Sequence, residues 1–165
     1  MRMLLLLLAL LSVAGVYFLG GNRISQVHVE SLYAASQQAF HSLDHEALCA
    51  MLDRDFEQRL TLHVGGQRSY ETLGKQDYCE AQEEILGALR QLGPLPNGRR
   101  LVDHRYTLTR ISIAPGGRSA TVETRATSAI PGIHSTERST DTLVRRRWKT
   151  RVVRSEGTAW VGPAG

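Results

Sequence analysis

A few polar residues of this 165-residue sequence could carry acid–base chemistry. Asp103 and Asp141 lie in strand-like stretches, and neither has apolar neighbours in the sequence that would clearly raise its pKa. His63 and His104 are candidate bases or ligands, although a lone histidine on a strand is more often structural or solvated. Tyr33 lies on the apolar face of an expected helix, where a tyrosine more often belongs to the core. The sequence therefore offers scattered candidates without a recognisable catalytic set.

Several familiar chemistries lack their sequence patterns. The spacing of histidine, aspartate and glutamate matches no zinc or calcium site, and no glycine-rich strand-to-helix loop predicts phosphate binding. The serines of the strand-like stretches have no nucleophile-elbow context. We therefore expect no metal and no cofactor.

The N-terminal segment predicts where the chain resides. Residues 3–19 are apolar, and about 20 such residues can cross a bilayer as a helix. Arg2 should keep the N-terminus in the cytoplasm, which places the rest of the chain outside it. We therefore expect residues 1–25 to be an inner-membrane anchor that crosses once, with the following domain in the periplasm.

The competing interpretation of this segment is a signal peptide that is cleaved on export, which would leave a secreted periplasmic domain. The stretch Val13-Ala14-Gly15 is a poor cleavage pattern, and no cysteine follows the apolar run for a lipid anchor. Both observations favour a permanent anchor.

The two cysteines, Cys49 and Cys79, lie in the exported part of the chain. An oxidising compartment would let them form a disulfide that closes a loop of about 30 residues. Two buried free thiols fit the sequence equally well.

The positive charge is concentrated in the second half of the sequence. Residues 1–94 carry 7 basic and 11 acidic side chains, whereas residues 95–165 carry 13 basic and 5 acidic ones. The densest cationic stretch surrounds Trp148 and comprises Arg145, Arg146, Arg147, Lys149 and Arg151. Anionic lipid headgroups or an anionic envelope protein would suit this stretch, and the alternative is a charged strand edge that prevents aggregation. Nucleic acid is not expected, because the domain should lie outside the cytoplasm.

The elements that must position these residues follow from hydrophobic periodicity. Helices are expected at three places, residues 27–43, 45–52 and 75–92. Strands are expected at six places, residues 56–64, 67–72, 105–114, 118–130, 134–145 and 148–154. Strands gathered in one run after the helices predict an α+β domain with an antiparallel sheet, which ends where Glu156-Gly157 breaks the pattern.

Three stretches resemble the nuclear-transport-factor-2-like superfamily, which includes SnoaL-like and ketosteroid-isomerase-like proteins. LDHEALCAMLDRDF at 43–56 resembles the family's helix that ends in acidic residues before the first strand. YETLGKQDY at 70–78 resembles the start of its third helix, and WKTRVV at 148–153 its last strand. The resemblance implies a cystatin-like cone, in which a curved sheet wraps three helices around a pocket and pairs with a second copy through its outer face. The domain would span residues 26–157, with a tail at 158–165.

The resemblance also implies what a catalytic member needs, namely a carboxylate base on the first strand inside the pocket, with buried donors nearby. The only carboxylate of residues 56–64 is Glu57, on the face opposite the apolar set. We therefore expect a membrane-tethered, non-catalytic binding or assembly module. The alternatives are a small-molecule-binding or isomerase- or dehydratase-like protein that uses the pocket, and an exported immunity-type protein. The pocket candidates are Tyr33, Phe40, His63, Tyr78 and His104.

Overall fold

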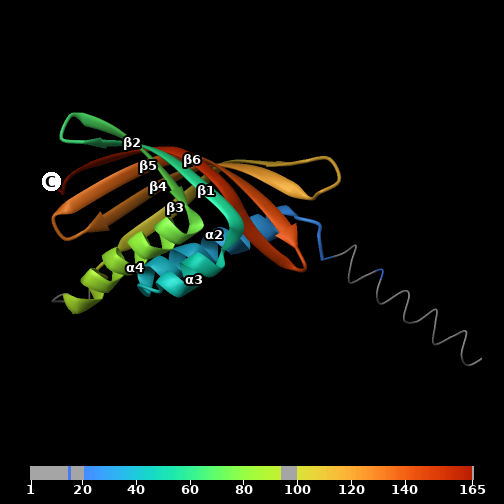
Figure 1. The fold of residues 1–165 in the computed structure, drawn as a ribbon, viewed down its shortest axis with the longest axis horizontal. Helices are drawn as coiled ribbons and strands as arrows, with labels where there is room; N and C mark the ends of the chain where they lie inside the picture. The colour runs from blue at the N-terminus through green and yellow to red at the C-terminus, as the bar shows by residue number, and fades with distance from the viewer. Residues whose placement is uncertain (1–14, 16–20, 94–99, 165) are drawn as a thin grey trace, which may run out of the picture.

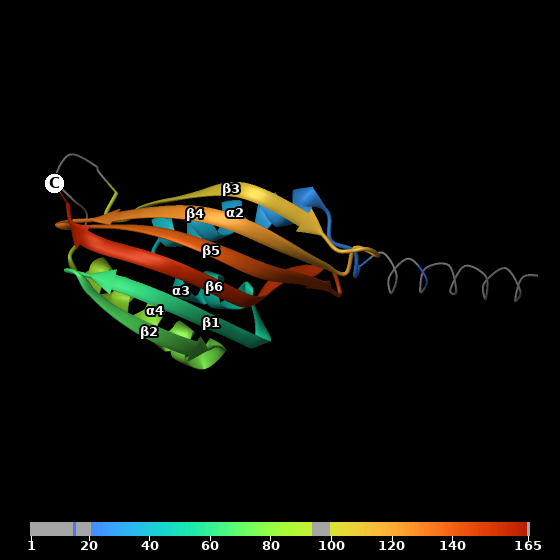
Figure 2. The same cartoon turned by 90° about the horizontal axis from the view of Figure 1, so that it is seen from above.

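The computed structural model describes residues 15, 21–93 and 100–164. Within them the element order is the predicted one: two helices, two strands, a helix and four strands. The helices are α2 (Gln26–His41), α3 (His45–Ala50) and α4 (Lys75–Gln91). The strands are β1 (Leu52–Val64), β2 (Gln67–Gly74), β3 (Asp103–Ile113), β4 (Ser119–Ile130), β5 (Ile133–Arg146) and β6 (Lys149–Pro163). The sheet is curved, and the helices lie together on one of its faces (Figures 1 and 2), so the predicted α+β class is confirmed.

Nearly all of the predicted membrane anchor, residues 3–19, falls outside the described residues. Among the residues that are described, no helix combines the length and the apolar character needed to cross a membrane.

The strands follow one another across the sheet in the order β2-β1-β6-β5-β4-β3. Strands joined by short turns pair antiparallel, as hairpins must. The pairing of β1 with β6 is parallel, so the prediction of a wholly antiparallel sheet is wrong at this one place. Its cause is the long connection between the two strands, through α4 and four further strands, which returns the chain beside β1 in the same direction.

The last strand is longer than its sequence pattern indicates. It was expected to end before Glu156-Gly157, yet β6 runs to Pro163 and pairs with both β1 and β5. A Cβ atom at Gly157 would lie 2.9 Å from the carbonyl oxygen of Arg138, so this glycine marks a close approach of two strands. Residues 158–163 therefore lie in the sheet, where the sequence predicted a tail.

The core lies between the helices and the inner face of the sheet. Val29 and Leu32 of α2 pack with Val122 of β4 and Leu143 of β5 in one buried cluster. In β4 the buried residues alternate with exposed ones, because successive side chains of a strand point to opposite faces. The same alternation decides which polar residues of the sheet face the helices.

Cys49 and Cys79, for which the sequence left bonded and free states open, form a disulfide. It joins α3 to α4, with 5.7 Å between the two Cα atoms. The bond ties together two of the helices that enclose the interior.

Candidate ligand-binding cavity

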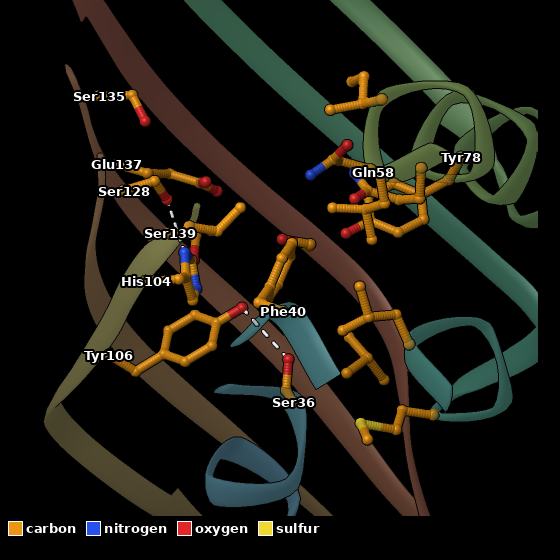
Figure 3. Close-up of a pocket in the computed structure, with 18 of the residues that line it drawn as sticks. Ser36, Phe40, Gln58, Tyr78, His104, Tyr106, Ser128, Ser135, Glu137 and Ser139 are labelled. Atoms are coloured by element: carbon orange, nitrogen blue, oxygen red, sulfur yellow. Dashed lines mark hydrogen bonds between the residues drawn. The ribbon is translucent and has the colours of Figure 1, made fainter. Parts of the chain in front are cut away.

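A cavity of about 400 Å³ lies between the helices and the inner face of the sheet (Figure 3). Its volume is within the range of pockets that hold small molecules. Helices α2, α3 and α4 contribute mainly apolar and aromatic side chains to its lining, whereas β5 contributes the largest share of the polar ones. The cavity therefore has an apolar wall and a polar wall.

The polar wall follows from the two-residue period of β5. Ser135, Glu137, Ser139 and Asp141 occupy alternate positions and all line the cavity. The next residue in this series is Leu143, which is fully buried. Glu137 was not among the residues proposed from the sequence. The signal that could have identified it is that its series of alternate residues ends on a leucine, which indicates an inward-facing strand face.

Asp141 lies in surroundings that the sequence did not suggest. It is 7% exposed, and burial raises the pKa of its carboxyl group, partly offset by hydrogen bonds from Tyr33 and Ser155. The Tyr33 hydroxyl donates to Oδ2 at 2.5 Å, and the Ser155 hydroxyl donates to Oδ1 at 2.7 Å. Burial and the Asp141 charge in turn raise the pKa of Tyr33, so this tyrosine keeps its proton. The expectation that Asp141 lacks an apolar environment is therefore wrong.

Glu137 reaches into the cavity four residues before Asp141 on β5, with Ser139 between them on the same face. Burial, and secondly the neighbouring Asp141 charge, raise the pKa of Glu137 to about 7. A Cβ atom at Gly157 would lie 3.3 Å from Oε1 of Glu137, so the missing side chain on β6 leaves room for the carboxyl group. Within the described part of the chain, no group forms a hydrogen bond to this carboxyl.

His104 and Tyr106 extend the lining from β3. The His104 Nδ1 atom lies 2.6 Å from the Ser128 hydroxyl, and its ring lies 4.2 Å from the Phe40 ring between centroids. Burial lowers the pKa of His104 to about 4, so its ring is neutral at physiological pH. Its Nε2 atom is buried and has no hydrogen-bond partner among residues 21–93 and 100–164. The Tyr106 hydroxyl lies 3.5 Å from the Ser36 hydroxyl on α2.

Four of the five residues proposed from the sequence as pocket candidates line the cavity: Tyr33, Phe40, Tyr78 and His104. The fifth, His63, is not in the lining, and its ring stacks on Trp160 with 5.7 Å between centroids. Glu57 forms an ion pair with Arg59 at 2.7 Å, and the next residue, Gln58, lines the cavity instead. The first strand thus presents an amide to the interior where a catalytic family member would need a carboxylate.

The cationic stretch around Trp148 divides over the β5–β6 hairpin. Arg145 is buried and donates to the Thr150 hydroxyl at 3.1 Å, whereas Arg146 forms an ion pair with Asp53 at 3.6 Å. Arg147 and Trp148 form the turn itself. Lys149 pairs with Arg146 in register, and Arg151 is half-buried in β6. These residues therefore share a hairpin but differ in burial and in partners.

No family model and no curated protein matches this sequence. Solved structures do match its fold. An NTF2-like protein of unknown function from Shewanella oneidensis is 13% identical with a TM-score of 0.60, over 82% of this chain and 99% of that one. A protein from Novosphingobium aromaticivorans described as a "putative scytalone dehydratase" is 15% identical with a TM-score of 0.59, over 84% of this chain and 86% of that one. An NTF2-like protein with a cystatin-like fold from the same organism is 18% identical with a TM-score of 0.56, over 81% and 80%.

Proposed function

We propose that this chain, whose fold is the NTF2-like, cystatin-like one, binds a small and largely apolar molecule in its cavity. One observation carries the proposal, namely that the polar wall of this largely apolar cavity holds a carboxyl group, that of Glu137, which has no hydrogen-bond partner among the described residues. Small-molecule sites typically combine an apolar lining with a few converging polar groups. An interior filled by aliphatic side chains would instead have favoured a binding or assembly module without a ligand pocket. The absence of a carboxylate base from the inner face of the first strand had suggested such a module.

The proposal is tested by filling the cavity from one strand. Ser135 lines the cavity, and Thr136 is the adjacent residue of β5, whose side chain points to the other face. We expect the full chain in mild detergent to bind small aromatic molecules saturably in calorimetry, Ser135→Phe to abolish this binding, and Thr136→Phe to preserve it. Equal binding by both variants, or no binding by the parent chain, would contradict a cavity site.

A second candidate function is proton transfer to or from the bound molecule. A carboxyl group whose pKa is near 7 is present in both protonation states at neutral pH, as a general acid–base catalyst requires. Tyr33 and Asp141 supply a buried hydroxyl and carboxyl nearby. Exchange of the ligand's carbon-bound hydrogens in D₂O, followed by NMR, should occur with the parent chain and not with Glu137→Gln. Absence of exchange in the parent chain would leave binding as the sole function.

We also propose that the domain is tethered at the periplasmic face of the inner membrane through residues 3–19, with the β5–β6 turn against the headgroups. Two backbone groups of the turn form hydrogen bonds to Gly21 and Asn22, which lie two and three residues after the end of the apolar segment. Trp148 N–H donates to the Gly21 carbonyl at 2.7 Å, and Arg147 N–H donates to the Asn22 side chain at 2.9 Å. Trp148 is 47% exposed, and tryptophan with flanking cations is typical of membrane interfaces.

The backbone of this turn supports the same proposal. Arg147 and Trp148 have φ angles of 50° and 69°, which side-chain-bearing residues rarely adopt and which cost on the order of 1 kcal/mol each. Asn-Gly is the favoured pair in such a hairpin turn. Strain of this kind can be a sign that the side chains serve a function.

Two single-tryptophan variants of the full chain in lipid nanodiscs test the position of the turn. Trp160→Phe leaves Trp148 as the fluorophore, and Trp148→Phe leaves Trp160, which lies elsewhere on the sheet. We expect brominated anionic lipids to quench Trp148 strongly and Trp160 weakly. Equal quenching would contradict the proposed orientation, and an N-terminal sequence that begins after residue 19 would contradict the anchor.

A further inference from the structure

The charges inside the cavity indicate which chemical class of small molecule it would bind. This inference rests on the binding function proposed above. Among the described residues, the lining includes the carboxyl groups of Glu137 and Asp141 but no lysine or arginine. Its histidine, His104, is held neutral by burial, which lowers its pKa to about 4. The cavity therefore carries acidic groups without an internal cation to balance them.

The aromatic lining suits the same kind of ligand. Besides His104, five rings of the described residues line the cavity, those of Tyr33, Phe40, Phe56, Tyr78 and Tyr106. The faces of aromatic rings attract cations, most strongly where water is excluded. Figure 3 shows Glu137 extending from β5 into the interior, with Gln58 and Tyr78 on the opposite side.

We infer that the cavity binds a hydrophobic amine as its ammonium ion, with the Glu137 carboxylate as the counter-ion and the aromatic rings around the charge. A charge-assisted hydrogen bond from an ammonium group to a carboxylate is about twice as strong as one between neutral groups. The remaining apolar lining, from α3, α4 and β1, would hold the hydrocarbon part of the molecule.

Glu137 is better suited than Asp141 to serve as the counter-ion. The Asp141 carboxyl already accepts hydrogen bonds from Tyr33 and Ser155, whereas that of Glu137 has no such partner among the described residues. Binding of an ammonium ion would supply the partner that Glu137 lacks. Asp141 would then serve mainly as a second negative charge nearby.

The groups that face Glu137 determine how binding depends on pH. They are Asp141 on the same strand, Tyr33 on α2, Tyr78 on α4 and Tyr106 on β3, and burial raises the pKa of each of these three tyrosines. The tyrosines therefore remain neutral, and β1 and β6 contribute only uncharged groups to the lining. Burial and the Asp141 charge raise the pKa of Glu137 to about 7, so at neutral and lower pH this carboxyl group largely carries a proton. Binding of an ammonium ion should displace that proton from Glu137.

Three probes with the same ring system and different charge test the inference: 1-naphthylmethylamine, 1-naphthalenemethanol and 1-naphthoic acid. Each is titrated calorimetrically into the full chain in zwitterionic nanodiscs at pH 6 and pH 8. We expect the amine to bind at least tenfold more tightly than the alcohol at pH 8, and the acid to bind most weakly. The amine's affinity should rise about tenfold from pH 6 to pH 8, as ionisation of a group with a pKa near 7 requires.

A pair of matched variants assigns the effect to Glu137. Glu137→Gln should remove both the preference for the amine and its pH dependence while the alcohol still binds. Glu123→Gln, on the outer face of β4 near Arg110, should change neither. If Glu137→Gln does not fold, the probe series and its pH dependence on the parent chain still decide the question.

The outcomes separate this inference from the function on which it rests. Alcohol binding as tight as amine binding, or amine binding that does not vary with pH, would overturn the amine inference and leave the cavity as a binding site. Failure of all three probes to bind would count against both.

Discussion

Glu137 should make the stability of this protein depend on pH. Burial and the Asp141 charge raise its pKa from 4.5 to about 7, so the folded chain holds the proton more tightly than the unfolded chain. The stability from this difference is fully present below about pH 4.5 and is lost as the pH rises through 7. At about 1.4 kcal/mol per pH unit the full loss is roughly 3 kcal/mol, of which about 2.5 kcal/mol falls between pH 5 and pH 8. Glu137→Gln should therefore match the parent chain at pH 5 and be the more stable protein at pH 8.

Guanidinium chloride unfolding at pH 5 and pH 8, followed by tryptophan fluorescence in mild detergent, measures this difference. Glu123→Gln is the matched control, because Glu123 lies mid-strand on the outer face of the neighbouring strand, where water screens its charge. Titration of the ¹³C-labelled side-chain carboxyl by NMR gives the pKa of Glu137 directly. The reasoning is refuted if Glu137→Gln loses as much stability as the parent chain between the two pH values, or if Glu137 titrates near 4.5.

Two further predictions concern the frame of the cavity. Gly157→Ala would place a Cβ atom 2.9 Å from a carbonyl oxygen of β5 and 3.3 Å from Oε1 of Glu137, so we expect it to lower the free energy of unfolding by about 1–3 kcal/mol. Gly162→Ala, whose Cβ would meet no atom within 4 Å, should change it by less than about 0.5 kcal/mol in the same denaturation experiment. Reduction of the Cys49–Cys79 disulfide, whose cysteines are 30 residues apart, should cost roughly 3 kcal/mol. An unchanged melting temperature in reducing agent would contradict that last expectation.

The order of the helices and strands could be predicted from the sequence because it depends on local periodicity and on turn residues. The parallel pairing of β1 with β6 could not be predicted, because the two strands are far apart in the chain and local sequence patterns do not specify which strands pair. The length of β6 was underestimated because Gly157 looks like a strand end in the sequence. In the folded chain that glycine lies inside the strand, at a point where two backbones approach too closely for a side chain.

The candidate site was harder to predict than the fold. The helix aromatics of the cavity, Tyr33, Phe40 and Tyr78, could be named because they share faces with core residues, whereas Phe56 and Tyr106 on the strands were not named. Glu137 was not identified, and Asp141 was named without its buried surroundings. Although their series of alternate residues ends on Leu143, an alternation of serine and acidic residues on a strand is equally typical of a surface exposed to water. These residues face inward because the helices cover their face of the sheet (Figure 2), an arrangement that depends on contacts between distant parts of the chain.

The net charge of the chain and the charge of its cavity point to opposite kinds of ligand. The sequence carries a net charge of +4, which alone would suggest an anionic partner. Successive side chains of β5 point to opposite faces of the sheet, which separates its negative charges from its positive ones. Glu137 and Asp141 face the cavity, and Arg138 faces outward. Burial and the Asp141 charge raise the pKa of Glu137 to about 7, and both causes are local to the cavity. We therefore expect the charge of the ligand to complement the acidic groups of the cavity, which means that it should be positive.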